Sequence, residues 1–429
     1  MRTLTRVAAV CVVVTLALGL SVLAHPRPTT DDEAGFAITV NPSSPAAPAE
    51  PTVDPVIVPT DTPTTVPEED EPAGGEQSRR TVTVLMSGDL LWHDTVWASA
   101  HEDAVRRGER QRFDFDPMFA AMKPMVHSAD LAICHEEVPF ASDDQHLSNY
   151  PVFAAPPVIA RWIASMGWDA CTTDSNHSID QGFDGLVRTA NLLETAGVRH
   201  VGTFRTRAER SKPVIVTTKN GVKVGIVGGT YSLNGFSLAP EQRWAVSKWD
   251  ADNLLFQARA AKAAGADIVL VQYHGGDEYS RLPNAQQVAL VRRLTASPAV
   301  DLVFAEHAHV VQPITRVNGK WVVYGMGNQL ARHAKPINDN REGIMPEFTF
   351  SEVAPGHWKV TRAVVIPTWV ALSPNIRVID LPSALAAAST SAADKSTYQA
   401  ALDRIKTYVD AMNADADGLT VSSGIPGSR

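Results

Sequence analysis

The sequence predicts an α/β fold, a layered sandwich with mixed sheets. Apolar strands alternate with helix-like segments from residue 81 onward, which is typical of βα units. Other strand pairs are joined by turn signals such as Asn318-Gly319, which indicate antiparallel hairpins. The chain is also 44% apolar, enough to build a core, so wholesale disorder is excluded.

Charge and composition set the N-terminal part of the chain apart. The 429 residues suffice for about two to three domains or for one large domain. The formal net charge is −9, yet residues 31–76 alone carry eleven carboxylates and no Lys or Arg, which leaves about +2 for the rest. A nearly neutral body argues against a nucleic-acid binder with a strong basic face.

Two segments precede the expected domain. Arg2 and Arg6 stand before an uncharged apolar run, so residues 1–24 are expected to be a signal peptide, either cleaved or kept as a membrane anchor. Residues 25–78 hold eleven of the 29 prolines, and this composition predicts a disordered linker, which we interpret as a spacer. The main domain is expected at 79–370, with a helical tail at 371–429.

The elements of the domain follow from local patterns. Single apolar strands are expected at residues 81–86, 130–134, 168–172, 267–273 and 301–305. Helices are expected at residues 183–196, 251–264, 284–297 and, in the tail, 397–412. Hairpins are expected at residues 213–227, 314–324 and 347–366, each around a turn signal.

The chain has three cysteines, which are too few for a disulfide framework or a structural Cys₄ zinc site. Cys11 lies in the N-terminal apolar run. The preferred interpretation of Cys134 and Cys171 is two separate small residues buried in strands. One disulfide between them is the alternative if the domain is exported.

Side chains that bind metals gather where the expected strands end, and six of the 13 histidines are among them. In layered α/β proteins the loops at the carboxyl ends of strands line the ligand crevice. Carboxylate, amide and imidazole groups without thiolates suit Zn²⁺, Mn²⁺, Fe or Co. The residues in question are Asp89, His93, His135, Glu136, Glu137, Asp174, Asn176, His177, His274, Asp277, Glu278, Glu306, His307, His309 and Asn328.

His307-Ala308-His309 is the most suggestive of these groups. On an extended segment the two imidazoles would project to the same side, because strand side chains alternate. Each motif alone has a structural alternative. Asp89 could belong to a turn, Asn176 could cap a helix, and His274 could be a hydrogen-bonded core residue. The set as a whole, in this order, predicts a metal site.

An ordered set of short motifs resembles the CapA family of poly-γ-glutamate capsule synthesis proteins, whose domain is similar to the calcineurin-like metallophosphoesterases. The matching stretches are Gly88-Asp89, the segment 130–139 with Glu137 and Pro139, Asn176-His177 with Asp180 and Gly182, Tyr273-His274-Gly275-Gly276-Asp277-Glu278-Tyr279, and His307-Ala308-His309 with Gln312 and then Asn328. The chain departs from the family pattern at Ser175, at His135 where Asn is usual, at Gly275 where Trp is usual, and at Glu306 where Gly is usual.

The resemblance implies an α-β-β-α sandwich of the metallophosphoesterase type that holds divalent metal ions, two in number, with Mn, Zn, Fe and Co not distinguished. A metal-bridged hydroxide would attack a phosphoester or a γ-glutamyl or amide bond. Catalytic roles are expected for His177 and His274, and outer roles for Asp180 and Glu278. The expected ligands are Asp89, Glu137, Asn176, His177, His274, His307 and His309, with His93, His135 and Asn328 as further candidates.

The same resemblance implies a place in the synthesis or export of a cell-envelope polymer. The protein is then expected outside the cytoplasm, either secreted or anchored to the cytoplasmic membrane. Its expected partners are an anionic envelope polymer or phosphoester substrate and membrane synthases, and not nucleic acid. The alternative is a non-catalytic accessory subunit that binds the polymer or a synthase.

Overall fold

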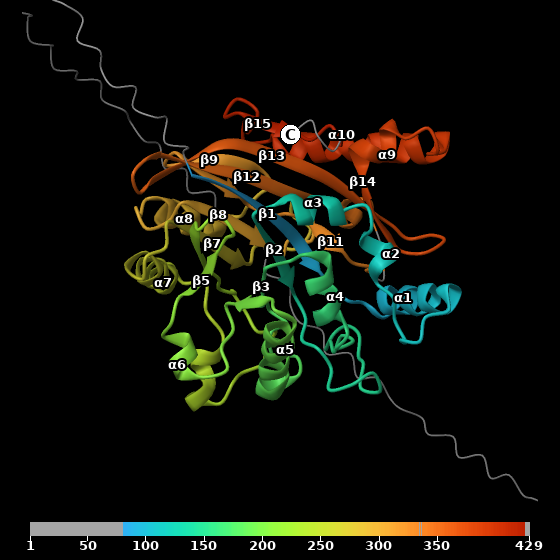
Figure 1. Ribbon diagram of the computed structural model, residues 1–429, viewed down its shortest axis with the longest axis horizontal. Helices are drawn as coiled ribbons and strands as arrows, with labels where there is room; N and C mark the ends of the chain where they lie inside the picture. Colours follow the sequence, from blue (N-terminus) through green and yellow to red (C-terminus); the bar gives the residue numbers. More distant parts are fainter. Residues whose placement is uncertain (1–79, 334, 336, 425–429) are drawn as a thin grey trace, which may run out of the picture. The chain divides into compact units, whose positions relative to one another are not determined.

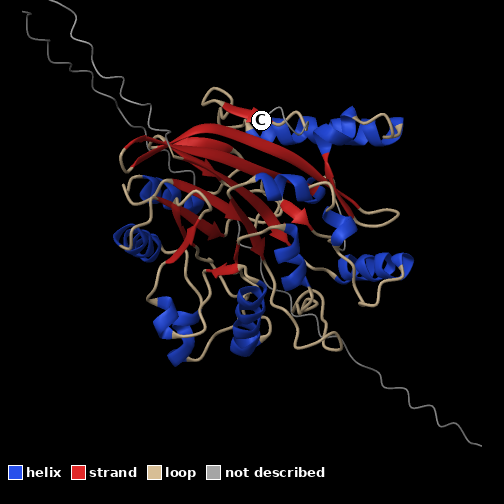
Figure 2. Cartoon of the chain, viewed as in Figure 1, coloured by secondary structure: helices blue, strands red, loops and turns tan. Residues whose placement is uncertain are grey.

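A computed structural model of the protein describes residues 80–333, 335 and 337–424. The segments expected to be a signal or anchor and a linker lie outside the described residues. The described residues belong to one compact unit. They form the α/β sandwich that the sequence predicts, with strands in the middle and helices around them (Figures 1 and 2).

Nine of the described strands form the first sheet, in the order β14-β13-β12-β1-β2-β3-β4, with β11 beside β1 and β15 beside β13. The half from β1 to β4 is parallel, and the half from β12 to β14 is antiparallel. The strands are β1 (Thr81–Leu90), β2 (Leu131–Glu136), β3 (Ala170–Thr172), β4 (Arg199–Val201), β11 (Asn328–Leu330), β12 (Glu342–Ala354), β13 (His357–Ala371), β14 (Arg377–Asp380) and β15 (Leu419–Val421).

The other six described strands form the second sheet, in the order β5-β6-β7-β8-β10-β9. Its centre, from β6 to β10, is parallel, and a hairpin closes each edge. The strands are β5 (Val214–Thr217), β6 (Lys223–Val227), β7 (Ile268–His274), β8 (Leu302–Glu306), β9 (Ile314–Val317) and β10 (Lys320–Val323).

Helices α1 to α4 cover the outer face of the first sheet, and helices α7 and α8 cover that of the second. In Figure 1, α7 and α8 lie at the left and α1, α2 and α4 at the right. The helices are α1 (Asp94–Arg107), α2 (Asp116–Phe119), α3 (Lys123–Ser128), α4 (Ile159–Met166), α5 (Gly182–Ala196), α6 (Arg207–Arg210), α7 (Ala251–Ala263), α8 (Ala285–Thr295), α9 (Leu381–Ala386) and α10 (Ala392–Val409), with 3₁₀ turns at η1 (Pro240–Ala245) and η2 (Asp339–Arg341).

Local signals explain where several helices begin and end. Asn284 caps α8 in a reciprocal capping box with Gln287, which satisfies two backbone N–H groups at the helix start. Gly197 ends α5 in the left-handed conformation that a glycine adopts without steric cost. Among the described residues, no helix is both long and apolar enough to cross a membrane.

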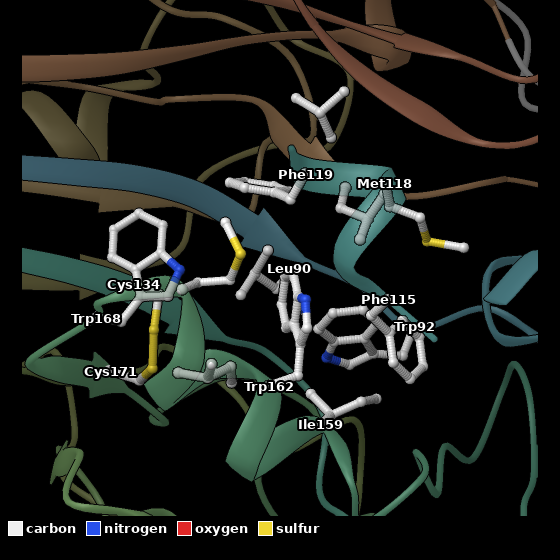
Figure 3. Close-up of a cluster of buried hydrophobic side chains, with 14 of the residues drawn as sticks. Leu90, Trp92, Phe115, Met118, Phe119, Cys134, Ile159, Trp162, Trp168 and Cys171 are labelled. Carbon is white, nitrogen blue, oxygen red and sulfur yellow. A yellow bond between two sulfur atoms is a disulfide. The ribbon is translucent and has the colours of Figure 1, made fainter. Parts of the chain in front are cut away.

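Three of the four apolar clusters among the described residues form the layers of the sandwich. The inner layer joins the two sheets and contains Met86 of β1 and Leu270 of β7. The second layer lies between the second sheet and helices α7 and α8. The third lies between the first sheet and helices α1 to α4, where Trp92 and Trp162 meet edge to face at 5.5 Å (Figure 3). The expected order of helix, sheet, sheet and helix is therefore confirmed.

Cys134 and Cys171 lie in this third layer and form a disulfide (Figure 3). They are directly opposite each other on the parallel strands β2 and β3, with 4.5 Å between their Cα atoms. Both residues are buried in strands, as expected. The preferred interpretation as two separate thiols is wrong, because register between strands, which spacing in the sequence does not reveal, places the two side chains together.

The C-terminal residues extend the first sheet. Strand β14 pairs with residues 368–371 of β13, and β15 pairs with residues 363–365 of the same strand. Helix α10 contributes Leu402 and Ile405 to the core between the sheets. This helix begins at Ala392, five residues before the expected start, where Ser391 caps it by accepting a hydrogen bond from the backbone N–H of Asp394.

Candidate metal centre

The carboxyl ends of five parallel strands converge on one edge of the sandwich. Strands β1, β2 and β3 come from the first sheet, and β7 and β8 come from the second. Because parallel strands end at the same edge, polar residues far apart in the sequence meet there. Five of the residues that the sequence singled out lie close together at this edge: Asp89, His135, Glu137, His274 and His309.

Asp89 lies at the centre of the cluster. It is the penultimate residue of β1, not a residue after the strand, and the register of β1 shifts around it, which turns its side chain into the site. Gly88 makes this possible, since a Cβ at that position would lie 2.0 Å from the carbonyl oxygen of Gly327. The backbone N–H of Asp89 donates to the same oxygen at 3.1 Å. The Gly-Asp pair thus places a buried carboxylate by close backbone approach.

Asp89, His135 and His274 form one group that is able to hold a cation, with ligand atoms within 4.8 Å of one another. The rings of His135 and His274 stack at 4.9 Å. Nδ1 of His135 lies 2.8 Å from the hydroxyl of Thr172, which leaves Nε2 facing Asp89 at 3.8 Å. Nε2 of His274 lies 2.7 Å from Oδ1 of Asn176, an acceptor, so Nδ1 of His274 stays unprotonated.

Asp89, Glu137 and His309 form a second group of the same size, which shares Asp89 with the first. Nδ1 of His309 lies 3.1 Å from Asp89, and its Nε2 lies 3.8 Å from Glu137. Asn328 touches the group through Oδ1, 2.9 Å from Nδ1 of His309, and donates its amide to the carbonyl of Asn340 at 2.8 Å. Asn328 is therefore placed to orient His309.

His307 and His309 reach the site by a different geometry from the one expected. Both residues have positive φ, 97° and 54°, so the segment is a turn in the left-handed region and not an extended strand. Each ring still faces the cluster. The His307 ring lies 4.8 Å from His274 and 6.1 Å from His309. The expected alternation of side chains is wrong, because β8 ends at Glu306 and the chain turns immediately.

Burial and charge divide the imidazoles into two classes. Burial lowers the pKa of His135 to about 4 and that of His307 to about 3, and it takes the pKa of His274 well below its usual value. These rings are neutral, which is the state that binds metal. For His309, burial is outweighed by Glu137 and Asp89, which raise its pKa to about 10. Burial raises the pKa of Glu137 well above its usual value.

The residues present fit a divalent cation. Both carboxylate oxygens of Glu137, Nε2 of His135, and Nδ1 of His274 and of His307 are buried without a hydrogen-bond partner among the described residues. A buried polar atom left without a partner costs about 1–3 kcal/mol, so their convergence on Asp89 indicates a ligand. The donors are oxygen and imidazole nitrogen, which suits Zn²⁺, Mn²⁺, Fe or Co.

His177 lies beside the two groups and forms a hydrogen bond with a carboxylate. Its Nδ1 lies 2.7 Å from Oδ2 of Asp180, and that oxygen also accepts the backbone N–H of Phe153 at 2.8 Å. The carboxylate acceptor places a proton on Nδ1 and leaves Nε2 directed away from Asp180. Asn234 reaches His177 from another loop, with its amide nitrogen 3.4 Å from Nε2.

The remaining sequence candidates lie at the margin. His93 is buried and accepts the backbone N–H of Arg332 at 3.2 Å, with its ring 5.0 Å from that of His333. Glu278 is exposed, and its charge helps to raise the pKa of His309. Glu306 is buried and accepts a hydrogen bond from Gln272 at 2.6 Å.

Four residues at the site escaped sequence reasoning: Thr172, Tyr231, Asn234 and His333. Thr172 is a strand residue of ordinary type, and the loop of Tyr231 and Asn234 shows no motif. His333 lies 3.0 Å from the Asn328 amide nitrogen through its Nε2. The position of His333, five residues after Asn328, is the one signal that could have drawn attention to it.

Comparison with family models identifies one match over this region. The model described as bacterial capsule synthesis protein PGA_cap matches residues 83–333. That range contains every residue of the two candidate metal-binding groups.

Curated relatives carry names of the same kind. The capsule biosynthesis protein CapA of Bacillus anthracis is 25% identical over 256 residues, which are 58% of this chain and 59% of that protein. The PGA biosynthesis protein CapA of Bacillus subtilis (strain 168) is 30% identical over 200 residues, 46% of this chain and 51% of that protein. A probable polyglutamine synthesis accessory protein of Mycobacterium tuberculosis is 25% identical over 232 residues, 51% and 57%. The matches thus span between half and three fifths of these relatives.

Solved structures with similarity to the chain include two with low sequence identity. The calcineurin-like phosphoesterase YfkN from Bacillus subtilis is 16% identical, with a TM-score of 0.41, and the match covers 77% of this chain and 99% of that one. A putative 5′-nucleotidase from Staphylococcus aureus is 14% identical, with a TM-score of 0.42, and the match covers 76% and 58%.

Proposed function

The chain belongs to the bacterial capsule synthesis protein PGA_cap family, and from this premise we propose that it is a metal-dependent hydrolase of cell-envelope polymer synthesis or export. The observation that carries the proposal is the pair of cation-binding groups that share Asp89. Two such groups around one carboxylate support the proposal of a two-metal hydrolase. The proposed bond is a phosphoester, with a γ-glutamyl or amide bond as the second substrate class to be tested.

The proposed roles follow from the contacts of each side chain. Divalent ions at the two groups would supply Lewis acidity and lower the pKa of bound water. Thr172 orients His135, Asn176 orients His274, and Asn328 orients His309. His307 offers its unpartnered Nδ1 beside His274. Such outer hydrogen bonds fix the ring orientation of metal-ligating histidines.

His177 is proposed as the proton donor to the leaving group, with Asp180 as its positioning residue. The carboxylate at 2.7 Å holds the ring through Nδ1. Nε2 is then the atom that exchanges a proton with a substrate. His274 is buried, with Nε2 engaged by Asn176, so we assign it to metal binding and not to proton transfer.

Envelope location is part of the proposal. The names of the relatives refer to capsule or PGA biosynthesis, and the family description refers to capsule synthesis. The disulfide between Cys134 and Cys171 supports a domain that folds in an oxidising compartment. Export through the segment at 1–24, an anionic polymer substrate and membrane synthase partners remain proposals on the same basis.

The direct test is hydrolysis by the purified chain after loading with Mn²⁺, Zn²⁺, Fe²⁺ or Co²⁺. The substrates are glycerol 2-phosphate, a phosphodiester and a γ-glutamyl peptide. We expect His177→Ala to lower kcat by about 10²- to 10⁴-fold. The exposed His357 is the matched control, and His357→Ala should retain full activity. Equal activity of His177→Ala and the unmodified protein would overturn the proposed reaction.

A non-catalytic accessory role is the second candidate. It is favoured by the printed name of the Mycobacterium tuberculosis relative, a probable synthesis accessory protein. The two candidates differ in what the metal does. If polymer binding, measured by calorimetry, is the same in metal-loaded and metal-free protein and no substrate is hydrolysed, the accessory role is supported and the hydrolase is excluded.

A further inference from the structure

Most of the exposed large hydrophobic side chains lie in segments that follow strands of the two sheets near the candidate metal centre. Of the nine large hydrophobic side chains that are exposed among the described residues, six lie in segments that follow β2, β6, β7 and β11. Exposed aromatic groups that gather at one place indicate a binding surface. The six, which we call the rim, are Tyr150, Tyr231, Phe236, Tyr279, Leu282 and Ile337.

Two tyrosines of the rim touch the histidines of the centre. The Tyr231 ring lies 4.5 Å from His307, and the Tyr279 ring lies 6.2 Å from His309. Both side chains keep part of their surface free, because they are 37% and 46% exposed. Each ring therefore has one side near a candidate ligand and part of its surface exposed to solvent.

The backbone holds both tyrosines in place. The N–H of Tyr231 donates to the carbonyl of His274 at 3.0 Å, and the N–H of Tyr279 donates to the carbonyl of Ala308 at 2.8 Å. Tyr279 has a φ of 61°, a left-handed conformation that is uncommon for a bulky residue. Strain of this kind costs about 1–3 kcal/mol and persists where surrounding contacts enforce it.

Trp249 packs against the Tyr231 ring. The two rings meet at 5.9 Å, and Trp249 occupies the space beside Gly275. A Cβ at position 275 would lie 2.6 Å from the indole, so the glycine, one of the departures from the family pattern, admits this ring. Aromatic residues from separate segments thus pack beside the candidate ligands.

An exposed carboxylate adjoins one of these tyrosines in the chain. Glu278 directly precedes Tyr279, and both residues are exposed. A carboxylate accepts hydrogen bonds from hydroxyl groups. Aromatic faces pack against the C–H faces of a ring. A ring that bears hydroxyl groups satisfies both conditions.

We propose that the rim tyrosines and Glu278 form a subsite for a sugar ring, so that the centre acts on a sugar phosphoester. The proposal rests on the proposed hydrolase function and names its substrate class. Tyr231 and Tyr279 stack on the ring, Glu278 accepts its hydroxyls, and the ester group points toward Asp89 and His177.

The test compares kcat/KM for glucose 1-phosphate and glycerol 1-phosphate, which differ in having or lacking a ring. The ratio should favour glucose 1-phosphate. Tyr279→Ala should lower this ratio about fivefold to tenfold, because it removes a stacking partner, and Tyr279→Phe should preserve it. Phe256→Ala is the matched control, since Phe256 is an exposed aromatic residue on α7, outside the rim, and the ratio should not change.

Other outcomes overturn the sugar subsite while leaving the hydrolase intact. If kcat/KM is highest for adenosine 5′-monophosphate and Tyr279→Ala removes this preference, the rim binds a nucleobase. If kcat/KM is highest for tri-γ-glutamate, the rim binds an acidic peptide. An unchanged ratio in Tyr279→Ala would remove the rim from recognition.

A binding experiment separates the two proposals. If no ester is hydrolysed, the hydrolase proposal fails, and calorimetric binding of glucose 1-phosphate to the full chain then tests the subsite alone. Weaker binding to Tyr279→Ala than to Tyr279→Phe supports the subsite. Equal binding to these two variants overturns it.

Discussion

At the scale of single residues, Thr172 fixes the orientation of the His135 ring. Its hydroxyl lies 2.8 Å from Nδ1, which leaves Nε2 for a cation beside Asp89. We predict that Thr172→Val weakens metal binding about 10- to 100-fold, the usual effect of losing the outer partner of a ligating histidine. Competition with a chromogenic chelator measures the affinity.

Thr295→Val is the control for this substitution. Thr295 is also buried, and its hydroxyl donates to a carbonyl within α8. Its replacement should lower stability without changing metal affinity. If Thr172→Val and Thr295→Val bind metal equally well, the role assigned to Thr172 is wrong.

The charge on His309 predicts how metal binding depends on pH. Glu137 and Asp89 outweigh burial and raise the pKa of His309 to about 10, so the metal-free protein keeps this ring protonated at neutral pH. A metal must displace that proton, and affinity should rise from pH 6 to pH 9 by about one log unit per pH unit for each proton released. Calorimetry in buffers of different ionisation enthalpy counts the protons.

The raised pKa of His309 also affects the stability of the metal-free protein, which should fall as pH rises. A raised folded-state pKa contributes stability that is complete below the unfolded value, about 6.5, and is lost as pH rises through about 10. Metal-loaded protein should therefore gain relative stability at alkaline pH. Affinity that stays flat or falls between pH 6 and pH 9 would contradict the assigned charge.

At the scale of elements, the disulfide ties β2 to β3 one residue before His135 and Thr172. It closes a loop with a sequence separation of 37 residues. Loop-closure entropy for a loop of this length gives about 4 kcal/mol of stabilisation. We predict that Cys134→Ala/Cys171→Ala lowers the free energy of unfolding by about 3–4 kcal/mol, measured by urea denaturation.

Reduction provides the control for this prediction. The unmodified protein unfolded in the presence of a thiol reductant should show the same loss as the double variant, and the double variant should not respond to the reductant. If reductant leaves the unfolding of the unmodified protein unchanged in a preparation whose thiols titrate as reduced, the bond contributes nothing to stability.

Strands and helices with strong local patterns were predictable, and their boundaries and mutual register were not. The apolar run of β7 and the capped helix α8 carry their own signals. The turn at His307 and His309 does not, because the end of β8 is fixed by its pairing with β7 and not by local sequence. The pairing of Cys134 with Cys171 depends on the same kind of information.

The site follows the same division. Histidines and carboxylates at strand ends predicted which residues meet, because parallel strands end at a common edge. Their supporting partners were not predictable, since Thr172 and Tyr231 are ordinary residues whose importance comes from neighbours in space. The sequence therefore indicates which chemical groups form the cluster, and the fold determines how their side chains are oriented.

At the scale of the whole molecule, the segment after residue 371 covers the far half of the first sheet. Strands β14 and β15 both pair with β13, and α10 buries Ala401, Leu402 and Ile405 in the core between the sheets. Arg404 on this helix also forms an ion pair with the buried Glu342 of β12. Removing the segment would leave a buried carboxylate unpaired and a sheet edge open to solvent.

We predict that a chain ending at residue 371 lacks a stable native state, because it loses apolar burial and exposes β13 to pairing with other chains. The loss should appear as aggregation, or as a Tm lowered by more than about 10 °C. A chain ending at residue 424 keeps β15 and α10 and is the matched control. Arg404→Met separates the contributions, since it removes only the ion pair. A soluble chain ending at residue 371 that unfolds cooperatively at the Tm of the control would show that residues 80–371 fold without the tail.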